Sequence, residues 1–251
     1  MSIGIDIGST ASKVVVLDDE AKVVKTLLTP SGWNSKETAE QIYRSLSEEG
    51  FSPKSHGIIA TGYGRISVPY AQKTVTEITC HGLGASHLFG DEATVIDIGG
   101  QDTKIILLSR GKVKDFLMND KCSAGTGKFL EVMANRLGFS LQEMLDAARK
   151  GTPAKISSMC TVFAESEVIS LMGQGRSRED IAAGVVDSIC HKVANLAGRK
   201  QTPASYVLTG GFSESDYVLE RLGEILGREV TSHPMGRFAG ALGAALLARK
   251  L

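Results

Sequence analysis

The sequence predicts an α/β protein built from two domains of similar plan. Short β-branched runs, typical of strands, alternate with longer segments of helical periodicity. A pattern of strand, glycine turn and strand occurs twice, because six residues between Ile5 and Leu17 recur unchanged 91 positions later, between Ile96 and Leu108. Two copies of one supersecondary unit in a chain of 251 residues indicate two domains.

The first half of the chain predicts a meander followed by alternating helices and strands. The three strands of the meander cover 3–8, 13–17 and 23–29. Ser35 is a suitable N-cap for a helix that ends at Gly50, where glycine accepts the left-handed conformation. A strand at 58–61 leads into the turn-rich Gly62-Tyr63-Gly64, and a helix through Cys80 to Phe89 follows.

The second half repeats the meander and then becomes mainly helical. The pattern restarts at Ala93, and the last strand of the second meander covers 112–118. Further elements are then expected in this order: helices at 127–137, 140–149, 161–172 and 178–197, a buried strand at 206–209, and helices at 214–226 and 239–248. We therefore predict one domain over 1–92 plus 239–251 and a second over 93–238.

The composition excludes disorder and any strong general attraction to polyanions. Hydrophobic residues make up 42% and charged residues 22% of the chain, as in ordinary globular proteins. The 28 basic and 28 acidic side chains cancel. No apolar run approaches the roughly 18 residues that span a bilayer, and the N-terminus lacks a signal-peptide pattern. We expect a cytoplasmic protein that binds neither nucleic acid nor membrane.

The first glycine turn has the composition of a phosphate-binding site. A strand ends in Asp6, and Gly8 then lets the backbone approach a ligand that the hydroxyls of Ser9 and Thr10 also face. Phosphates would repel Asp6 unless it faced a cation, so we expect this carboxylate to hold Mg²⁺ through water. Lys13 adds positive charge nearby.

The second turn repeats this arrangement, and a third glycine pair follows a later strand. Asp97 takes the place of Asp6, and Gln101 is positioned to hold a γ-phosphate or a water. Asp6, Asp97 and Gln101 are the candidate catalytic residues. The expected nucleotide contacts are Gly8, Ser9, Thr10, Ala11, Ser12 and Lys13 in the first turn, Gly99, Gly100 and Gln101 in the second, and Gly210, Gly211 and Arg237 further on.

These turns resemble the phosphate and adenosine motifs of a known superfamily. The residues 6–10, 97–102 and 208–211 are similar to the two phosphate motifs and the adenosine motif of acetate and sugar kinases, chaperone ATPases and actin. The glycine-rich 240–245 resembles the second connecting helix of that superfamily. The resemblance implies two ribonuclease-H-like domains with ATP in the cleft between them.

Two of the four cysteines are candidate metal ligands. Cys122 and Cys160 each precede a predicted helix, where free N–H groups and the helix dipole stabilise a thiolate. An iron–sulfur cube takes four thiolates, so two chains would be needed to complete one. Cys80 and Cys190 are expected in the core. Spacing alone leaves Cys122 and Cys160 open between ligands and buried thiols.

A closer resemblance addresses that choice. The stretches 119–127 and 160–167, with 99–102, are similar to the ATP-dependent activators of 2-hydroxyacyl-CoA dehydratases, over nearly the whole chain. The resemblance implies one [4Fe-4S] cluster per homodimer, bound by Cys122 and Cys160 of each subunit. ATP with Mg²⁺ would drive one electron from it into an acceptor iron–sulfur enzyme, after loading by reduced flavodoxin or ferredoxin. Benzoyl-CoA reductase ATPases and double-cubane reductases share the pattern.

Two other functions fit the same fold and stay open. A small-molecule kinase would need an acceptor pocket and a general base, for which 251 residues leave little room. A filament-forming ATPase would use the cysteines only as core residues. Arg237 fits equally a residue stacked on adenine and a turn before the last helix, and Trp33 fits a loop cover or a partner contact. Lys121, Lys128 and Arg136 fit a partner-docking face, although solvated helix charges are the default expectation.

Overall fold

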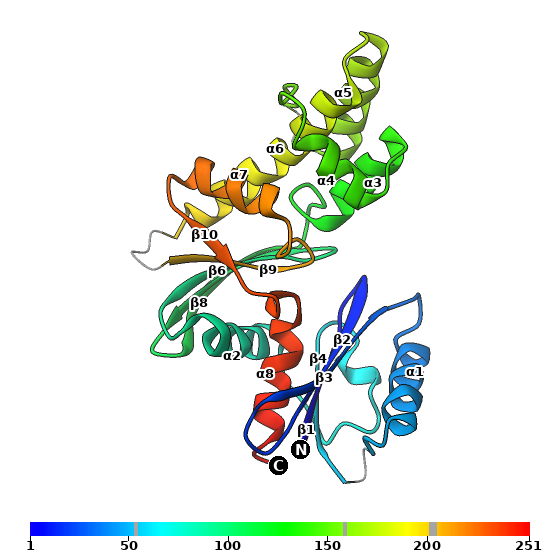
Figure 1. Ribbon diagram of the computed structural model, residues 1–251, viewed down its shortest axis with the longest axis vertical. Helices are drawn as coiled ribbons and strands as arrows, with labels where there is room; N and C mark the ends of the chain where they lie inside the picture. The colour runs from blue at the N-terminus through cyan, green and yellow to red at the C-terminus, as the bar shows by residue number, and fades with distance from the viewer. Residues whose placement is uncertain (53–54, 158–159, 201–204) are drawn as a thin grey trace. The chain divides into compact units, whose positions relative to one another are not determined.

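The computed structural model describes residues 1–52, 55–157, 160–200 and 205–251, which divide into two compact units (Figure 1). The first unit comprises 1–95, 106–115 and 235–251, and the second comprises 96–105 and 116–234. Two five-stranded sheets organise the chain, with helices packed against them. The predicted α/β class is confirmed.

The first sheet is built around the strand that ends at the first glycine turn. Strands β1 (Ser2–Ile7), β2 (Ala11–Leu17) and β3 (Val23–Pro30) form the predicted antiparallel meander. Strand β4 (Gly57–Thr61) pairs with β1 in parallel, and β5 (Lys73–Thr74) completes the order β3-β2-β1-β4-β5. Asp6, near the end of β1, is therefore flanked by Lys13 on β2 and Thr61 on β4.

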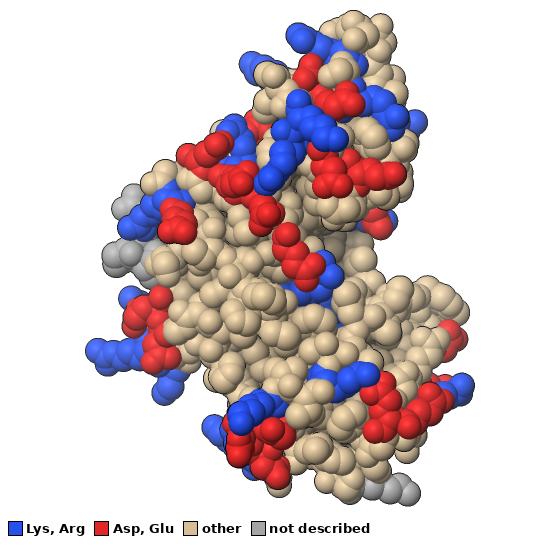
Figure 2. Space-filling model, in the orientation of Figure 1, with Lys and Arg blue, Asp and Glu red and all other residues tan. Residues whose placement is uncertain are grey.

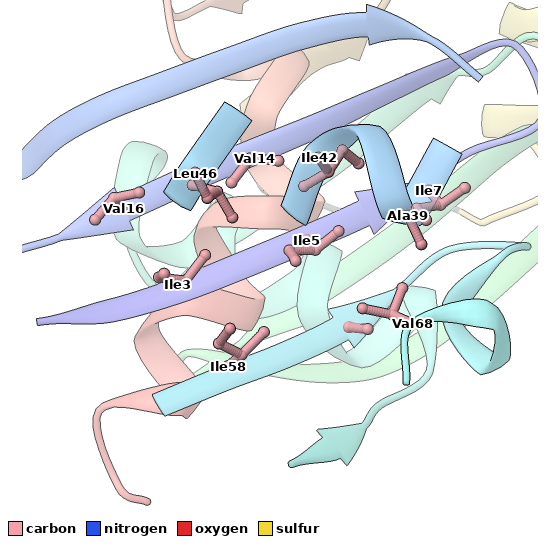
Figure 3. Packing of buried hydrophobic residues seen from close by; sticks show 11 residues of the cluster. Ile3, Ile5, Ile7, Val14, Val16, Ala39, Ile42, Leu46, Ile58 and Val68 are labelled. Atoms are coloured by element: carbon pink, nitrogen blue, oxygen red, sulfur yellow. The ribbon is translucent and has the colours of Figure 1, made fainter. Parts of the chain in front are cut away.

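Helices cover both faces of this sheet, and the alternation along the strands explains why. Side chains of β1 and β2 such as Ile3, Ile5 and Val14 pack with Ile42 of α1 (Ser35–Glu48) on one face (Figure 3). The intervening Val15 of β2 packs with α8 (Ala239–Ala248) on the other face. A strand buried on both sides needs apolar residues at consecutive positions, which is what the sequence pattern contains.

Backbones approach one another closely where α8 crosses β1 and α2 (Glu77–Phe89). A side chain on Gly4 would collide with the carbonyl oxygen of Ala241. Side chains on Gly84 of α2 and Gly243 of α8 would likewise collide with carbonyl oxygens of the facing helix. Glycine permits these contacts because it has no Cβ.

The second sheet repeats the meander and adds two parallel strands. Strands β6 (Ala93–Ile98), β7 (Thr103–Ser109) and β8 (Lys112–Asn119) follow one another at one side. Strand β9 (Ser205–Gly210) lies beside β6 and pairs in parallel with β10 (Val230–Ser232). The order is β10-β9-β6-β7-β8.

The helices of the second unit pack around one long helix. Helix α6 (Arg178–Ala197) is contacted by α3, α4, α5 and α7. Their bounds are α3 (Gly127–Leu137), α4 (Leu141–Ala148), α5 (Thr161–Gly173) and α7 (Asp216–Leu226). Twelve residues of α6 are buried, as expected of a central helix.

Every predicted helix and strand is present, with small shifts at the ends. The predicted N-cap Ser35 is wrong: Asn34 caps α1, because its side chain accepts the N–H of Lys36, and Ser35 is the first helical residue. Ser140 and Ser215 are the N-caps of α4 and α7, so these helices begin one and two residues later than predicted. Strands β5 and β10 were not predicted, because two and three residues are too few to give a periodicity. Among the described residues, no helix is long and apolar enough to cross a membrane.

Candidate functional site

The first glycine turn presents a nearly buried carboxylate beside exposed hydroxyl groups. Asp6 is 6% exposed, whereas Ser9 and Thr10 are exposed at the tip of the hairpin. The N–H of Gly8 donates to the carbonyl of Ala11 at 3.2 Å, which closes the turn. A phosphate at this turn would meet the two hydroxyls.

The remaining side chains of this turn differ in how available they are. The Nζ of Lys13 lies 4.0 Å from an Asp6 carboxylate oxygen, and its side chain is 19% exposed. The hydroxyl of Ser12 is buried and hydrogen-bonded to the hydroxyl of Ser31 at 2.8 Å. Lys13 can therefore reach a ligand, whereas Ser12 would offer only its backbone.

Two glycines make room for the carboxylate of Asp6. A Cβ on Gly62, which has φ +83°, would collide with one Asp6 oxygen, and a Cβ on Gly240 would lie 2.8 Å from the other. Gly64 contributes an N–H that donates to the carbonyl of Ile7 at 2.9 Å. Glycine is required here both by space and, at Gly62, by conformation.

The second turn holds its carboxylates in a buried network. Lys104 is 2% exposed, and its Nζ lies 2.6 Å from Asp102 and 3.4 Å from Asp97. The hydroxyl of Thr209 donates to Asp97 at 3.1 Å. Gln101 is exposed at the tip of the turn, where a phosphate or water can reach it. The turn is thus buried at its base and exposed at its tip.

Gly210 leaves room for the carboxylate of Asp97 in the same way as Gly62 leaves room for that of Asp6. It has φ +86°, and a Cβ there would lie 2.8 Å from an Asp97 oxygen. Each glycine follows a buried threonine at the end of the strand that runs beside the turn. Sequence reasoning identified Gly210 but missed Gly62 as its counterpart. The shared Thr-Gly pair after an apolar strand was the signal that could have found it.

The second turn is hydrogen-bonded to the start of α3. The N–H of Gly127 donates to the carbonyl of Gly99 at 2.8 Å, and the N–H of Lys128 donates to that of Gly100 at 2.9 Å. Cys122 lies five residues before Gly127, in the loop that leads into α3. Backbone hydrogen bonds therefore join the second turn to the helix that directly follows the Cys122 loop.

Cys122 and Cys160 are both exposed, and their flanking residues are bonded to each other. The hydroxyls of Ser123 and Thr161, each directly after a cysteine, are 2.8 Å apart. Cys160 is the N-cap of α5, as the sequence indicated. Hydrogen bonding therefore brings together two segments that are 38 residues apart in sequence.

Further hydrogen bonds hold each cysteine segment. The side-chain amide of Asn119 donates to the carbonyls of Cys122 and Ala124, at 3.0 and 3.3 Å. On the other segment, the N–H and the hydroxyl of Ser157 both donate to Glu167, each at 2.8 Å. Sequence reasoning missed the roles of Asn119 and Glu167, because neither belongs to a recognisable spacing.

The other two cysteines are core residues, as predicted. Cys80 and Cys190 are fully buried. Burial raises the pKa of the Cys80 thiol to about 11 and that of Cys190 to about 12. Both thiols are therefore protonated and unreactive at neutral pH.

Helix α5 exposes an apolar surface next to the cysteine pair. Val162 and Phe163 are 66% and 67% exposed, and Ile169 and Met172 are 49% and 43% exposed. Only Ala164 and Val168 of this helix are buried. An apolar surface of this kind on a folded unit typically marks a contact with another protein.

Two cations of α3 form ion pairs with nearby acidic side chains. Lys128 lies 2.9 Å from Glu131, and Arg136 of α3 pairs with Glu165 of α5. Acidic and basic side chains are interspersed on the face drawn in Figure 2. Trp33 is 89% exposed and so does not cover a loop, while Arg237 is half-buried just before α8.

Comparison with known proteins assigns the chain to a family. The model of the BadF/BadG/BcrA/BcrD ATPase family matches residues 3–248. The chain belongs to this ATPase family. Among its relatives, the (R)-2-hydroxyglutaryl-CoA dehydratase activating ATPase of Acidaminococcus fermentans is 42% identical, over 99% of this chain and 97% of the relative. The activator of lactoyl-CoA dehydratase of Anaerotignum propionicum is 41% identical over 98% and 96%.

Solved structures of the family agree with this fold. The A. fermentans dehydratase component A superposes with a TM-score of 0.93 at 42% identity, covering 99% of this chain and 97% of that one. The Clostridium difficile activator of 2-hydroxyisocaproyl-CoA dehydratase, with bound ADPNP, gives 0.92 at 35%, covering 99% and 94%. A glucokinase from Streptomyces griseus, at 17% identity and TM-score 0.63 over 100% and 99%, shares the fold alone. The predicted resemblance is confirmed.

Proposed function

We propose that this ATPase is an ATP-driven one-electron donor to a partner iron–sulfur enzyme, in the first place a 2-hydroxyacyl-CoA dehydratase. The observation that carries the proposal is the exposed, hydrogen-bonded pair of cysteine segments, joined through α3 to the second glycine turn. The names of the relatives, which activate such dehydratases, support the same acceptor.

The cysteine pair fits half of a shared [4Fe-4S] cluster. Within the part of the chain that the structure describes, no group of three or more His, Cys, Asp or Glu side chains could hold a metal ion. One chain thus offers two exposed thiols, and a homodimer with Cys122 and Cys160 from each subunit offers four. The exposed apolar residues of α5 support a subunit contact at this place. When bound, the cluster would supply the electron that leaves for the acceptor.

The glycine turns supply the groups that MgATP requires. We assign Asp6 to Mg²⁺ through water, and Ser9, Thr10 and Lys13 to phosphate oxygens. The exposed Gln101 is assigned to the γ-phosphate or the attacking water. The other predicted contacts provide backbone groups and space, at Gly8, Ala11, Ser12, Gly99, Gly100, Gly210 and Gly211, with Arg237 and Asp97 as supporting side chains.

Coupling between nucleotide and electron requires that ATP contact one conformation better than the other. A γ-phosphate held by Gln101 would bias the second turn, and the bonds from Gly99 and Gly100 to α3 would pass that bias to the Cys122 loop.

We also propose the domain limits 1–92 with 239–251 and 93–238, a cytoplasmic location, and reduced flavodoxin or ferredoxin as the electron source.

Anaerobic purification tests the proposal directly. We expect a brown homodimer with four iron atoms per dimer, and ATP-dependent reduction of a dehydratase by the wild-type protein. Cys160→Ser should lose the iron and the electron transfer, whereas the matched control Cys190→Ser, in the core, should keep both. Colourless wild-type protein would instead favour the kinase or the filament-forming ATPase. Transfer to a double-cubane protein or benzoyl-CoA reductase, but not to a dehydratase, would change the acceptor.

A further inference from the structure

One lysine of α6, Lys192, lies against the loop that follows Cys122. The Nζ of Lys192 is 4.8 Å from the centre of the Phe129 ring, and its Cβ lies 3.6 Å from where a side chain on Gly125 would begin. Gly125 belongs to the loop after Cys122, and Phe129 to the first turn of α3. The stem of Lys192 is thus held between the cysteine loop and the helix that follows it.

Lys192 lies within electrostatic range of both candidate cluster ligands and of one carboxylate. Its ammonium interacts electrostatically with Cys122, Cys160 and Glu167. Burial lowers the pKa of Lys192, and the negative charges of these three partners oppose that effect. Glu167 is in turn engaged by the N–H and hydroxyl of Ser157. Lys192 is thus a half-buried cation held beside the Cys122 loop and within electrostatic range of both cysteines.

We infer that Lys192 is a positioning residue that sets the reduction potential of the cysteine-bound centre. The inference rests on the proposed function. One-electron reduction would add one negative charge to the centre that the two thiolates would hold, and no proton is required for balance. A cation fixed nearby stabilises the reduced form more than the oxidised form, because the interaction grows with the charge. Partial burial reduces solvent screening of this effect.

The test is the midpoint potential of the anaerobic, cluster-loaded dimer, measured by redox titration with electron paramagnetic resonance. We expect Lys192→Met to disfavour one-electron reduction about tenfold, which is about 59 mV toward more negative potential. Lys192→Arg, which keeps the charge, should stay at the wild-type value. Lys150→Met removes an exposed cation from the same unit and should also leave the potential unchanged.

The outcomes separate this inference from the proposed function. A wild-type protein without iron would overturn both. Loaded Lys192→Met with the wild-type potential would overturn the inference alone, as would Lys192→Arg shifted as far as Lys192→Met. If Lys192→Met fails to load, Lys192→Gln takes its place: retained loading with a negative shift supports the inference, and an unchanged potential overturns it.

Discussion

The two copies of the glycine turn have the same closing backbone hydrogen bond, but their lysines differ in exposure. In the first copy, Lys13 is 4.0 Å from Asp6 and remains partly exposed. In the second, Lys104 is buried and lies 3.4 Å from Asp97. The lysine at this repeat position is therefore accessible to a ligand in the first unit, as Lys13, and buried in the second, as Lys104.

A single position in the repeat accounts for the difference. Ala11 of the first turn corresponds to Asp102 of the second, and both close the hairpin by accepting an N–H from the preceding glycine. Only Asp102 also offers a carboxylate, which lies 2.6 Å from Lys104. A second anion beside Asp97 therefore explains why Lys104 can be buried, since a buried charge needs close partners.

The largest effect is expected from removing the buried lysine. Lys104→Met leaves Asp97 and Asp102 without their cation, and should lower the free energy of unfolding by about 3–5 kcal/mol. Lys13→Met is the matched control, because the equivalent lysine is partly exposed, and should cost less than about 1 kcal/mol. Urea denaturation measures both. Equal losses would show that the copies are not specialised as described.

A smaller effect is expected from making the second copy resemble the first. Asp102→Ala places the residue of the first turn at the equivalent position and leaves Lys104 with Asp97 alone, 3.4 Å away. We expect a loss of about 2 kcal/mol, because one charge partner remains. Combined with Lys104→Met, the losses should be strongly non-additive in a double-mutant cycle. Additive losses would contradict a direct interaction between the two residues.

The first copy should show its specialisation in ligand binding. Lys13→Met should weaken ATP binding about tenfold, or about 1.4 kcal/mol, because one cation near the phosphates is lost. Isothermal titration calorimetry with a non-hydrolysable ATP analogue and Mg²⁺ measures the change. Lys13→Arg should retain most of the affinity. Wild-type affinity in Lys13→Met would assign the lysine no role in nucleotide binding.

The buried thiol of Cys190 in the second unit should make the stability of the protein depend on pH in the alkaline range. The folded-state pKa of Cys190, about 12, lies above its unfolded value of 9.0, so unfolding releases a proton as pH rises. The buried, protonated thiol of Cys190 therefore contributes its full stabilisation of the folded state below pH 9. This contribution is lost progressively as the pH rises from 9 to about 12. At pH 10 the expected loss is about 1 kcal/mol. Cys190→Ala should show a shallower fall in stability between pH 8 and 10; an unchanged slope would contradict the assignment.

The local parts of the site could be predicted from the sequence. The recurrence of Asp6 and Gly8 at Asp97 and Gly99 identified both turns, and the apolar neighbours of Cys190 placed it in the core. These features depend on residues a few positions apart, so spacing alone records them. The distinction between the turns was missed, although Asp102 in the place of Ala11 was the signal that could have indicated it.

Contacts between distant segments left no local signal. The bond from Ser123 to Thr161 joins residues 38 positions apart, and the exposure of Phe163 contradicts the ordinary expectation for an aromatic residue. The sequence does not distinguish Lys192 from the other helical lysines, because its contact with Gly125 exists only in the folded structure. Such features become visible only once tertiary packing is known.

The glycine contacts between α2, α8 and β1 determine how the protein tolerates mutation. Main chain rests directly on main chain at Gly4, Gly84 and Gly243, so no rotamer change can absorb a bulkier residue there. An added methyl group would push α8 away from β1 at Gly4, and away from α2 at Gly84 or Gly243. Substitutions elsewhere in this core can be accommodated by repacking of side chains. These three glycines cannot be replaced in that way, so they fix the spacing of the backbones around the strand that carries Asp6.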